Sequence, residues 1–249
     1  MRANEVGVGE TGVGEMSAGE GAAGEIGAVT PGQIGVIFDC DGTLIDSMGV
    51  WREVEDDLAA RAGVTLSVAD IDEIAASSIP EVGSIFFERF GLGESAEDVV
   101  DMIYAAMMAF YTTRAFALPG ALELVRGLVD RGVQVSVASS TPKPLLEAAL
   151  AHCGFTPYLR AIVSVDDVGQ SKRSAAVYDR ARELMGTSLA NTWGVEDAAY
   201  ALATLRHAEY RTLGVYDDDL AGTYEELAQL ADHAVHSLED VSADELIAW

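Results

Sequence analysis

Short runs of apolar, often β-branched residues recur along the chain from residue 34 onward. Runs of this kind, without polar alternation, are typical of strands covered on both faces of a sheet. Segments with helical spacing of apolar residues lie between most of them. Strands that alternate with helices predict an α/β fold with a parallel, doubly wound sheet and right-handed crossovers. The predicted strands are residues 34–38, 133–138, 161–165, 192–195, 212–216 and 233–235, and the predicted helices are 120–131, 144–152, 174–185, 198–208 and 223–231.

Residues 47–118 interrupt this alternation, because they carry helical signals and no convincing strand. Ser47 is placed to cap a first helix, which Gly63 would end. Residues 102–111 are apolar on nearly every side but too few to span a bilayer, so they are typical of a core helix in a small bundle. We therefore predict a helical insert after the first strand of the sheet.

The N-terminal segment follows a different pattern. Glutamate recurs at every fifth position among many glycines, and no apolar face arises at a period of two or 3.6. We predict a disordered Gly/Glu-rich tail over residues 1–32. The rest of the chain then divides into an α/β core at 33–46 and 119–249 and a helical cap at 47–118.

Composition narrows the choice of partners. Hydrophobic residues make up 49% of the 249, enough for a sizeable core. The 41 Asp+Glu outnumber the 15 Lys+Arg and give a formal net charge of −26. An acidic surface repels phosphate backbones and anionic lipids, so we expect neither nucleic acid nor membrane as a partner.

The two cysteines form no disulfide or zinc pattern, and we find no signal peptide, so we expect a cytoplasmic protein. The sequence gives no indication of an oligomeric state.

Two aspartates follow the first predicted strand. Ligands of open parallel sheets bind just beyond the carboxyl ends of the strands, so this position is a candidate site. Asp39 and Asp41 would repel each other there unless a cation lies nearby. The adjacent Gly42 allows the backbone to approach an anion closely. A solvated loop with an Asx-turn explains one of these aspartates well and the pair poorly.

Three later strand ends carry further candidates. Ser139, Ser140 and Thr141 are three hydroxyl residues that lead into a helix, whose N-terminus suits a phosphate, although ordinary N-capping, taken alone, is the simpler explanation. Lys172 follows the third strand and is one of only two lysines among the 15 basic residues, which makes a merely solubilising role less convincing. Glu196 and Asp197 form a second acidic pair after the fourth strand.

Together these motifs resemble those of a known family. Asp39-Cys40-Asp41-Gly42-Thr43 resembles the Asp-x-Asp-Gly-Thr signature of the haloacid dehalogenase (HAD) superfamily, and the other three groups match its remaining motifs in order. The resemblance covers about residues 33–240 and extends to members with a helical cap of the first type, a phosphatase and β-phosphoglucomutase-like group. It implies a Rossmann-like core and a Mg²⁺-dependent phosphohydrolase that acts on a small phosphorylated metabolite.

The resemblance also implies roles for the two aspartates and for the metal ligands. Asp39 would attack phosphorus and form an aspartyl-phosphate, while Asp41 would protonate the leaving alcohol and then activate water. One carboxylate must be ionised to attack and the other must carry a proton. Mg²⁺ would be held by Asp39, the backbone carbonyl of Asp41 and Asp197, with Glu196 as an outer partner.

The same resemblance assigns the phosphate contacts. Ser139 would bind a phosphate oxygen, assisted by the backbone N–H groups of Gly42 and Ser140. Lys172 would bridge Asp39 and the phosphate. The flanks of the lysine depart from the frequent Gly-Lys-Pro, because Ser171 precedes it and Arg173 follows it. A further aspartate found in some members is Ala201 here.

Three alternatives remain. A β-phosphoglucomutase would have a cap histidine where this chain has Trp51. Residues 78–81, where a substrate-binding arginine is expected, contain no cation and one acid, Glu81, which would repel the second phosphate of a bisphosphate intermediate. Water is therefore the predicted phosphoryl acceptor, with the mutase as the alternative. A catalytically silent phosphate- or metal-binding relative is a second alternative. A receiver domain of signalling systems also uses aspartates, a hydroxyl and a lysine, but it is about half as long and has no helical insert.

Overall fold

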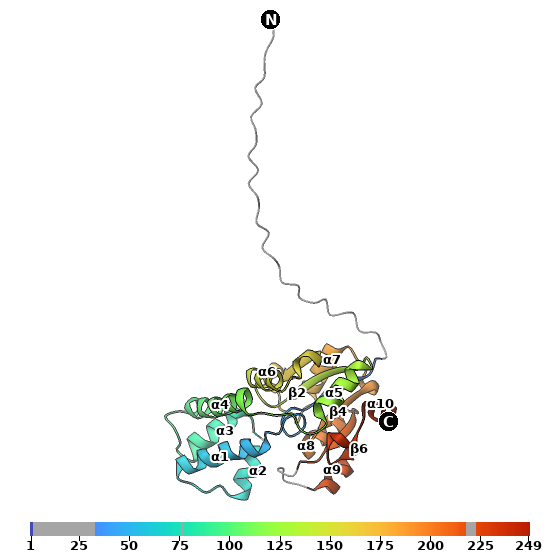
Figure 1. Ribbon diagram of the computed structural model, residues 1–249. Helices are drawn as coiled ribbons and strands as arrows, with labels where there is room; N and C mark the ends of the chain where they lie inside the picture. The colour runs from blue at the N-terminus through green and yellow to red at the C-terminus, as the bar shows by residue number, and fades with distance from the viewer. Residues whose placement is uncertain (2–32, 76, 218–222) are drawn as a thin grey trace.

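The core of the protein is a six-stranded parallel sheet in the order β3-β2-β1-β4-β5-β6 (Figure 1). The computed structural model describes residue 1 and residues 33–75, 77–217 and 223–249, so the predicted tail lies outside the described residues apart from Met1. All neighbouring strands pair in parallel, which confirms the predicted doubly wound sheet. The strands are β1 (Gly35–Phe38), β2 (Gln134–Ser139), β3 (Ala161–Ser164), β4 (Thr192–Glu196), β5 (Arg211–Val215) and β6 (His233–Val235).

Helices cover both faces of this sheet because successive strand residues point to opposite sides. Val36 and Phe38 of β1 pack in the same cluster as Leu124, whereas Ile37 packs in another cluster with Val177. One face carries α5 (Ala121–Asp130), α6 (Lys143–His152) and α10 (Ala243–Ala248), and the other carries α7 (Ala176–Met185), α8 (Ala199–His207) and α9 (Tyr224–Leu230). The five predicted core helices are present, and the short α10 is an addition that the sequence pattern did not indicate.

The register of the central strands brings the candidate residues to one edge. Phe38 at the end of β1 lies beside Val137 of β2 and Val195 of β4. The next residue, Asp39, donates its backbone N–H to the Val195 carbonyl at 2.9 Å. Side chains that follow these three strands therefore emerge at the same carboxyl edge of the sheet.

A helical insert lies between β1 and α5 in the chain and beside the core in space (Figure 1). Its helix α4 (Ala96–Thr113) is amphipathic with a broad apolar face, and Val99, Ile103, Met107 and Phe110 are buried at spacings of three and four residues. The insert consists of α1 (Met48–Ala62), α2 (Val68–Ala75), α3 (Ile79–Ser84), a π-helical turn (Ile85–Arg89) and α4 (Ala96–Thr113).

Both predicted ends of the first insert helix can be compared with the structure. Gly63 ends α1 in the left-handed conformation, with φ at 70°, as the sequence predicted. Ser47 stands at the N-terminal end of α1, but its hydroxyl makes no capping bond and instead donates to Asp41. The capping prediction for this side chain is therefore wrong: its oxygen accepts no backbone N–H, because Ser47, with φ at −135° and ψ at −14°, lacks the extended backbone typical of a capping serine and its side chain turns towards Asp41. Within the described ranges, no helix has the length and hydropathy needed to cross a bilayer.

Candidate active site

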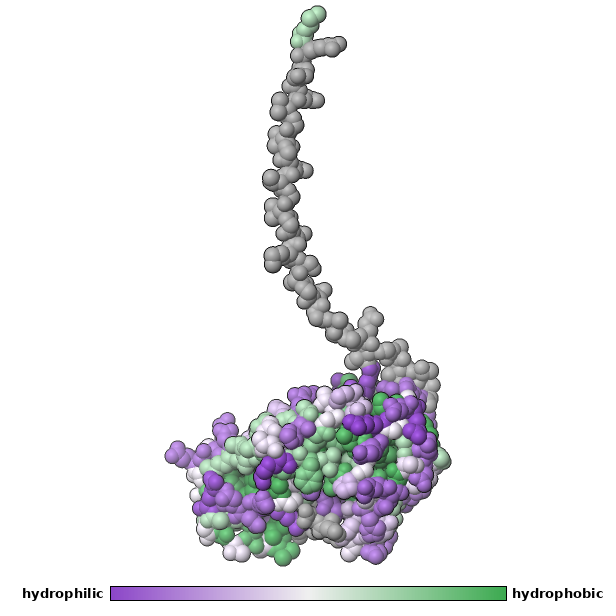
Figure 2. Space-filling model, in the orientation of Figure 1, coloured by the Kyte–Doolittle hydropathy of each residue, from purple (hydrophilic) through white to green (hydrophobic). Residues whose placement is uncertain are grey.

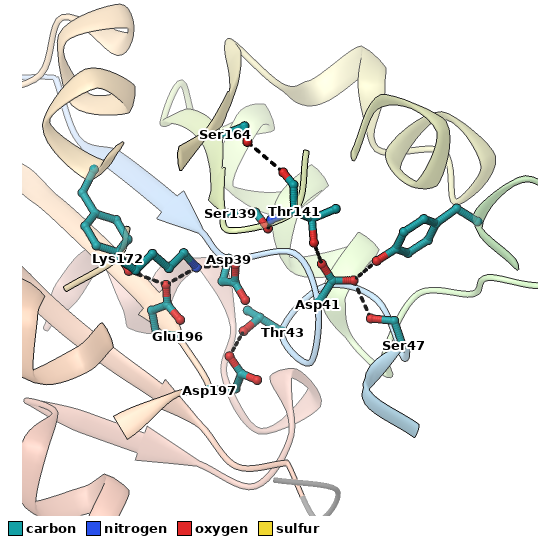
Figure 3. A network of polar contacts seen from close by, with 12 residues as sticks. Asp39, Asp41, Thr43, Ser47, Ser139, Thr141, Ser164, Lys172, Glu196 and Asp197 are labelled. Atoms are coloured by element: carbon teal, nitrogen blue, oxygen red, sulfur yellow. Dashed lines mark hydrogen bonds and ion pairs between the residues drawn. The ribbon is translucent and has the colours of Figure 1, made fainter. Parts of the chain in front are cut away.

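Asp39 and Lys172 form a buried ion pair at the carboxyl end of β1 (Figure 3). The Lys172 ammonium donates to Asp39 Oδ1 and also to Glu196 Oε1, the latter at 2.6 Å. The hydroxyl of Tyr178, on α7, donates to the same Glu196 oxygen at 2.7 Å. Asp39 is only 7% exposed and Lys172 only 3% exposed, so both charges lie in a largely dry site.

Three carboxylates converge around this lysine. Asp39, Glu196 and Asp197 each offer an oxygen that lies within 4.8 Å of the others. Lys172 supplies one positive charge against these three acids, and Glu196 Oε2 is buried without a hydrogen-bond partner among the described residues. A set of buried carboxylate oxygens with an unmatched acceptor fits a hard divalent cation. The donor set therefore agrees with the metal site expected from the motifs.

The protonation of these groups depends on their burial and on one another. Burial raises the pKa of Asp39 to about 7, although the Lys172 ammonium acts in the opposite direction. Burial, with the charges of Asp39 and Glu196, raises the pKa of Asp197 well above its ordinary value. Burial alone would lower the pKa of Lys172, but the two carboxylates beside it raise that pKa instead. The lysine is therefore protonated, and a bound cation would favour the ionised form of the acids.

The close approach of the Asp41–Thr43 loop to these acids requires a glycine. Gly42 has a φ of 78°, and a Cβ atom there would lie 2.2 Å from Asp197 Oδ2. The Thr43 hydroxyl donates to Asp197 Oδ1 at 3.4 Å. The Gly42 N–H donates to the Ile45 carbonyl at 2.9 Å, so a phosphate contact through this N–H, as expected from the motif, would share or replace that bond.

Asp41 occupies a different environment from Asp39. Its Oδ1 accepts hydrogen bonds from the Ser47 hydroxyl at 2.6 Å and from the Tyr111 hydroxyl, and its Oδ2 accepts from the Thr141 hydroxyl at 2.7 Å. These donors come from the start of α1, from α4 and from the loop after β2 (Figure 3). Burial and the Asp41 charge raise the pKa of Tyr111 well above its ordinary value, which keeps its hydroxyl protonated as a donor.

The loop after β2 contributes hydroxyl groups. Ser139 is buried, and its Oγ accepts the backbone N–H of Thr141 at 3.0 Å. Because that bond uses Oγ as an acceptor, the Ser139 proton is available to a ligand. Ser164 of β3 donates to the Thr141 carbonyl at 2.9 Å and thereby supports the loop.

Three side chains of this site were not assigned to it from the sequence: Ser47, Tyr111 and Tyr178. Tyr111 had a recognisable signal, because a tyrosine hydroxyl in the apolar stretch 102–111 usually finds a polar partner when it is buried. Thr141, by contrast, belongs to the hydroxyl run after β2. Tyr178 had no such signal, since its contact with Glu196 depends on how α7 packs on the sheet.

A cavity of about 490 Å³ joins the site to the insert. On the core side, Asp39, Asp41, Ser139, Ser140, Lys172 and Asp197 line it, together with Glu196. On the other side it is lined by residues of α1, α2, α3 and α4. The predicted site residues are thus brought to one cavity, with the exception of Gly42, which lies in the adjoining loop.

Comparisons with known proteins agree with this arrangement. Hexitol phosphatase B of Escherichia coli (strain K12) is 27% identical over 221 residues, which cover 88% of this chain and 99% of that protein. Phosphoglycolate phosphatase of Rhodobacter capsulatus is 30% identical over 156 residues, 60% of this chain and 70% of that protein. The crystal structure of β-phosphoglucomutase from Clostridium difficile shares the fold, with a TM-score of 0.72 at 17% identity over 86% of this chain and 95% of that one.

The family itself follows from a match over most of the chain. A sequence model of the haloacid dehalogenase-like hydrolases matches residues 35–209, which begin at β1 and include all four strand-end motifs. The fold, with its helical insert after β1, agrees with that match. The family and the enzyme class predicted from the motifs are confirmed, and the chain belongs to the haloacid dehalogenase-like hydrolases.

Proposed function

We propose that this enzyme hydrolyses a small phosphate monoester in two steps, through an aspartyl-phosphate on Asp39. The observation that carries the proposal is that two neighbouring aspartates lie in different environments. Asp39 is paired with a protonated lysine in a dry acidic cluster, whereas Asp41 is oriented by three hydroxyl donors. Two carboxyl groups in distinct environments can serve as nucleophile and as general acid/base. The phosphatase relatives support this reaction class.

The same geometry supports Mg²⁺ as the cofactor. Asp39 and Asp197 would hold the ion directly, and the Asp41 backbone carbonyl is the third expected ligand. Glu196, whose Oε2 has no hydrogen-bond partner in the described part of the chain, would be an outer partner. When bound, the cation reduces repulsion between a carboxylate and a phosphate dianion and stabilises charge on the transferring group.

The side chains of this chain account for the remaining chemistry. Lys172 holds Asp39 in place while the Ser139 proton is donated to a phosphoryl oxygen. An Asp39 oxygen bonds to phosphorus as the bond from phosphorus to the alcohol oxygen breaks, and that oxygen takes a proton from Asp41. Asp41, now ionised, takes a proton from water as the water oxygen attacks phosphorus, which releases inorganic phosphate and restores Asp39.

Turnover of an aryl phosphate in the presence of Mg²⁺ tests the proposal. We expect wild-type enzyme to release phosphate and Asp39→Asn to release none above background. Asp57→Asn is a matched control, because Asp57 lies on the exposed side of α1 in a surface ion pair with Arg61. A folded wild-type protein without turnover would favour the catalytically silent alternative.

A phosphosugar mutase is the second candidate, and one feature of the cavity favours it. Arg52 and Arg173 line the cavity and could bind a second phosphate group. Glu81, expected from the sequence to repel that phosphate, instead caps α3: Glu81 Oε2 accepts the Ser78 N–H at 2.7 Å, and Glu81 is not among the described residues that line the cavity. The prediction that Glu81 repels a second phosphate is therefore wrong. Trp51, which stands where a mutase would have its cap histidine, does line the cavity, so that argument against a mutase remains.

Product analysis separates the two reactions. The hydrolase proposal predicts inorganic phosphate from β-glucose 1-phosphate, if that ester is accepted, and no glucose 6-phosphate. Conversion to glucose 6-phosphate without matching release of phosphate would establish the mutase instead.

A further inference from the structure

The insert side of the cavity is mostly apolar. Trp51 and Leu58 lie on one face of α1, at positions seven residues apart, and both line the cavity. Apolar side chains from α2 and α4 continue this wall, and Figure 2 shows hydrophobic surface at the end of the insert where α2 lies. We call this surface the apolar wall; besides Trp51 and Leu58 it includes Met48, Ile71, Ile74 and Ile103.

One acidic side chain, Glu55, interrupts the apolar wall. It lies between Trp51 and Leu58 on the same face of α1, lines the cavity and is partly buried. Among the residues that the structure describes, none makes a hydrogen bond with its carboxylate or an ion pair within 4.0 Å, and its strongest charge interaction is with the exposed Arg52. Burial raises the pKa of Glu55 to about 7, which agrees with a carboxyl group that lacks a close partner.

Several other polar side chains around the cavity have partners within the protein. Arg173 lies over the ring of Tyr200, 5.2 Å from its centroid. Glu226 accepts the Thr223 backbone N–H at 3.0 Å as the cap of α9. The acids at the carboxyl edge of the sheet either lie in the cluster around Lys172 or, in the case of Asp41, accept hydrogen bonds from hydroxyl side chains. Among the described residues, Arg52 and Glu55 are the charged groups of the insert that line the cavity, and Glu55 is the hydrogen-bond acceptor of the two.

We propose that the alcohol part of the substrate is largely apolar and carries one hydrogen-bond donor, an amino or hydroxyl group, that binds Glu55. This inference rests on the proposed phosphohydrolase activity and names its substrate class. A polyol would leave several hydroxyl groups without partners against the apolar wall, which is unfavourable. A short acid such as glycolate would leave the apolar wall uncovered. A cavity of about 490 Å³ has room for a larger alcohol.

A series of phosphate esters tests the apolar part of the proposal on the full-length enzyme with Mg²⁺. We expect kcat/KM to rise from methyl to butyl to hexyl phosphate by about fourfold for each methylene buried, the equivalent of about 0.8 kcal/mol. Hexyl phosphate should also exceed sorbitol 6-phosphate and phosphoglycolate. If the esters are hydrolysed but kcat/KM stays constant or falls with chain length, the proposed substrate class is wrong and the proposed phosphohydrolase activity still stands. If no ester is hydrolysed, both proposals are wrong.

A matched pair of variants on α2 tests the wall itself. Ile71 is 44% exposed and lines the cavity, whereas Val68 on the same helix is 76% exposed and does not. We expect Ile71→Ser to reduce the advantage of hexyl over methyl phosphate and Val68→Ser to preserve it. An equal effect of both substitutions would contradict the wall as a binding surface.

The donor part is tested with 6-aminohexyl and 6-hydroxyhexyl phosphate. Glu55→Gln should lower kcat/KM for at least one of them, relative to hexyl phosphate, by about tenfold and mainly through KM, as expected for loss of a hydrogen bond to a charged group. Glu53→Gln is the control, since Glu53 is exposed on α1 and does not line the cavity. The ester that is affected identifies the donor as amine or hydroxyl, and unchanged ratios for both would overturn the role of Glu55.

Discussion

The two ends of the cavity are built in opposite ways. At the carboxyl edge of the sheet, Asp39, Lys172 and Asp41 are buried, charged or hydrogen-bonded, and each has named partners. At the insert, the lining is largely apolar, and Glu55 has no close partner within the described residues. Groups with several fixed partners hold one geometry, as chemistry requires, whereas an apolar wall mainly selects by size and hydrophobicity. The core is therefore expected to determine the reaction and the insert to select the alcohol.

The largest effect is expected at the reaction end. Asp39→Asn removes the proposed nucleophile and should lower kcat by at least about 1,000-fold, as loss of a covalent nucleophile does elsewhere. The measurement is phosphate release under saturating aryl phosphate, with circular dichroism to show that the variant is folded. Near-normal turnover of a folded variant would remove Asp39 from the mechanism.

Chelation tests the acidic cluster without changing any residue. Excess EDTA should lower turnover by at least about 100-fold, because a bound cation contributes several kcal/mol of charge stabilisation. Added Mg²⁺ should restore it. Full activity in EDTA would show that the reaction needs no exchangeable cation at the acidic cluster.

Tyr111 links the two regions, since it belongs to α4 of the insert and donates to Asp41 of the core. Tyr111→Phe should lower kcat by about tenfold, the value of a hydrogen bond to a charged group, with little change in KM. Tyr104→Phe, on the same helix and only partly buried, is the control. A change in KM alone would place Tyr111 with the substrate-selecting region instead.

The smallest effect is expected from the N-terminal segment. Because the Gly/Glu repeat has no apolar face, deletion of residues 2–32 should change kcat/KM by less than about twofold and leave the melting temperature nearly unchanged. Thermal unfolding and aryl phosphate turnover, each compared with the full chain, measure both quantities. A large loss in either would mean that this segment contributes to the folded enzyme.

Sequence alone was sufficient for the strands, the core helices and the residues at the strand ends. Strand and helix periods are local, and parallel strands place whatever follows them at one edge, so the sequence pattern by itself associates Asp39, Lys172 and Asp197. The short α10 escaped prediction, since its six residues carry too little periodicity to stand out.

The tertiary structure decided which side chains turn towards the site from distant segments. Tyr111 lies 70 residues from Asp41, Thr141 lies 100 residues away, and both meet it only because the insert and the β2 loop pack around β1. The position of Glu55 inside the apolar wall depends in the same way on how α1 is rotated against α2 and the core. Helical periodicity defines a face, but only packing against other elements determines what that face meets.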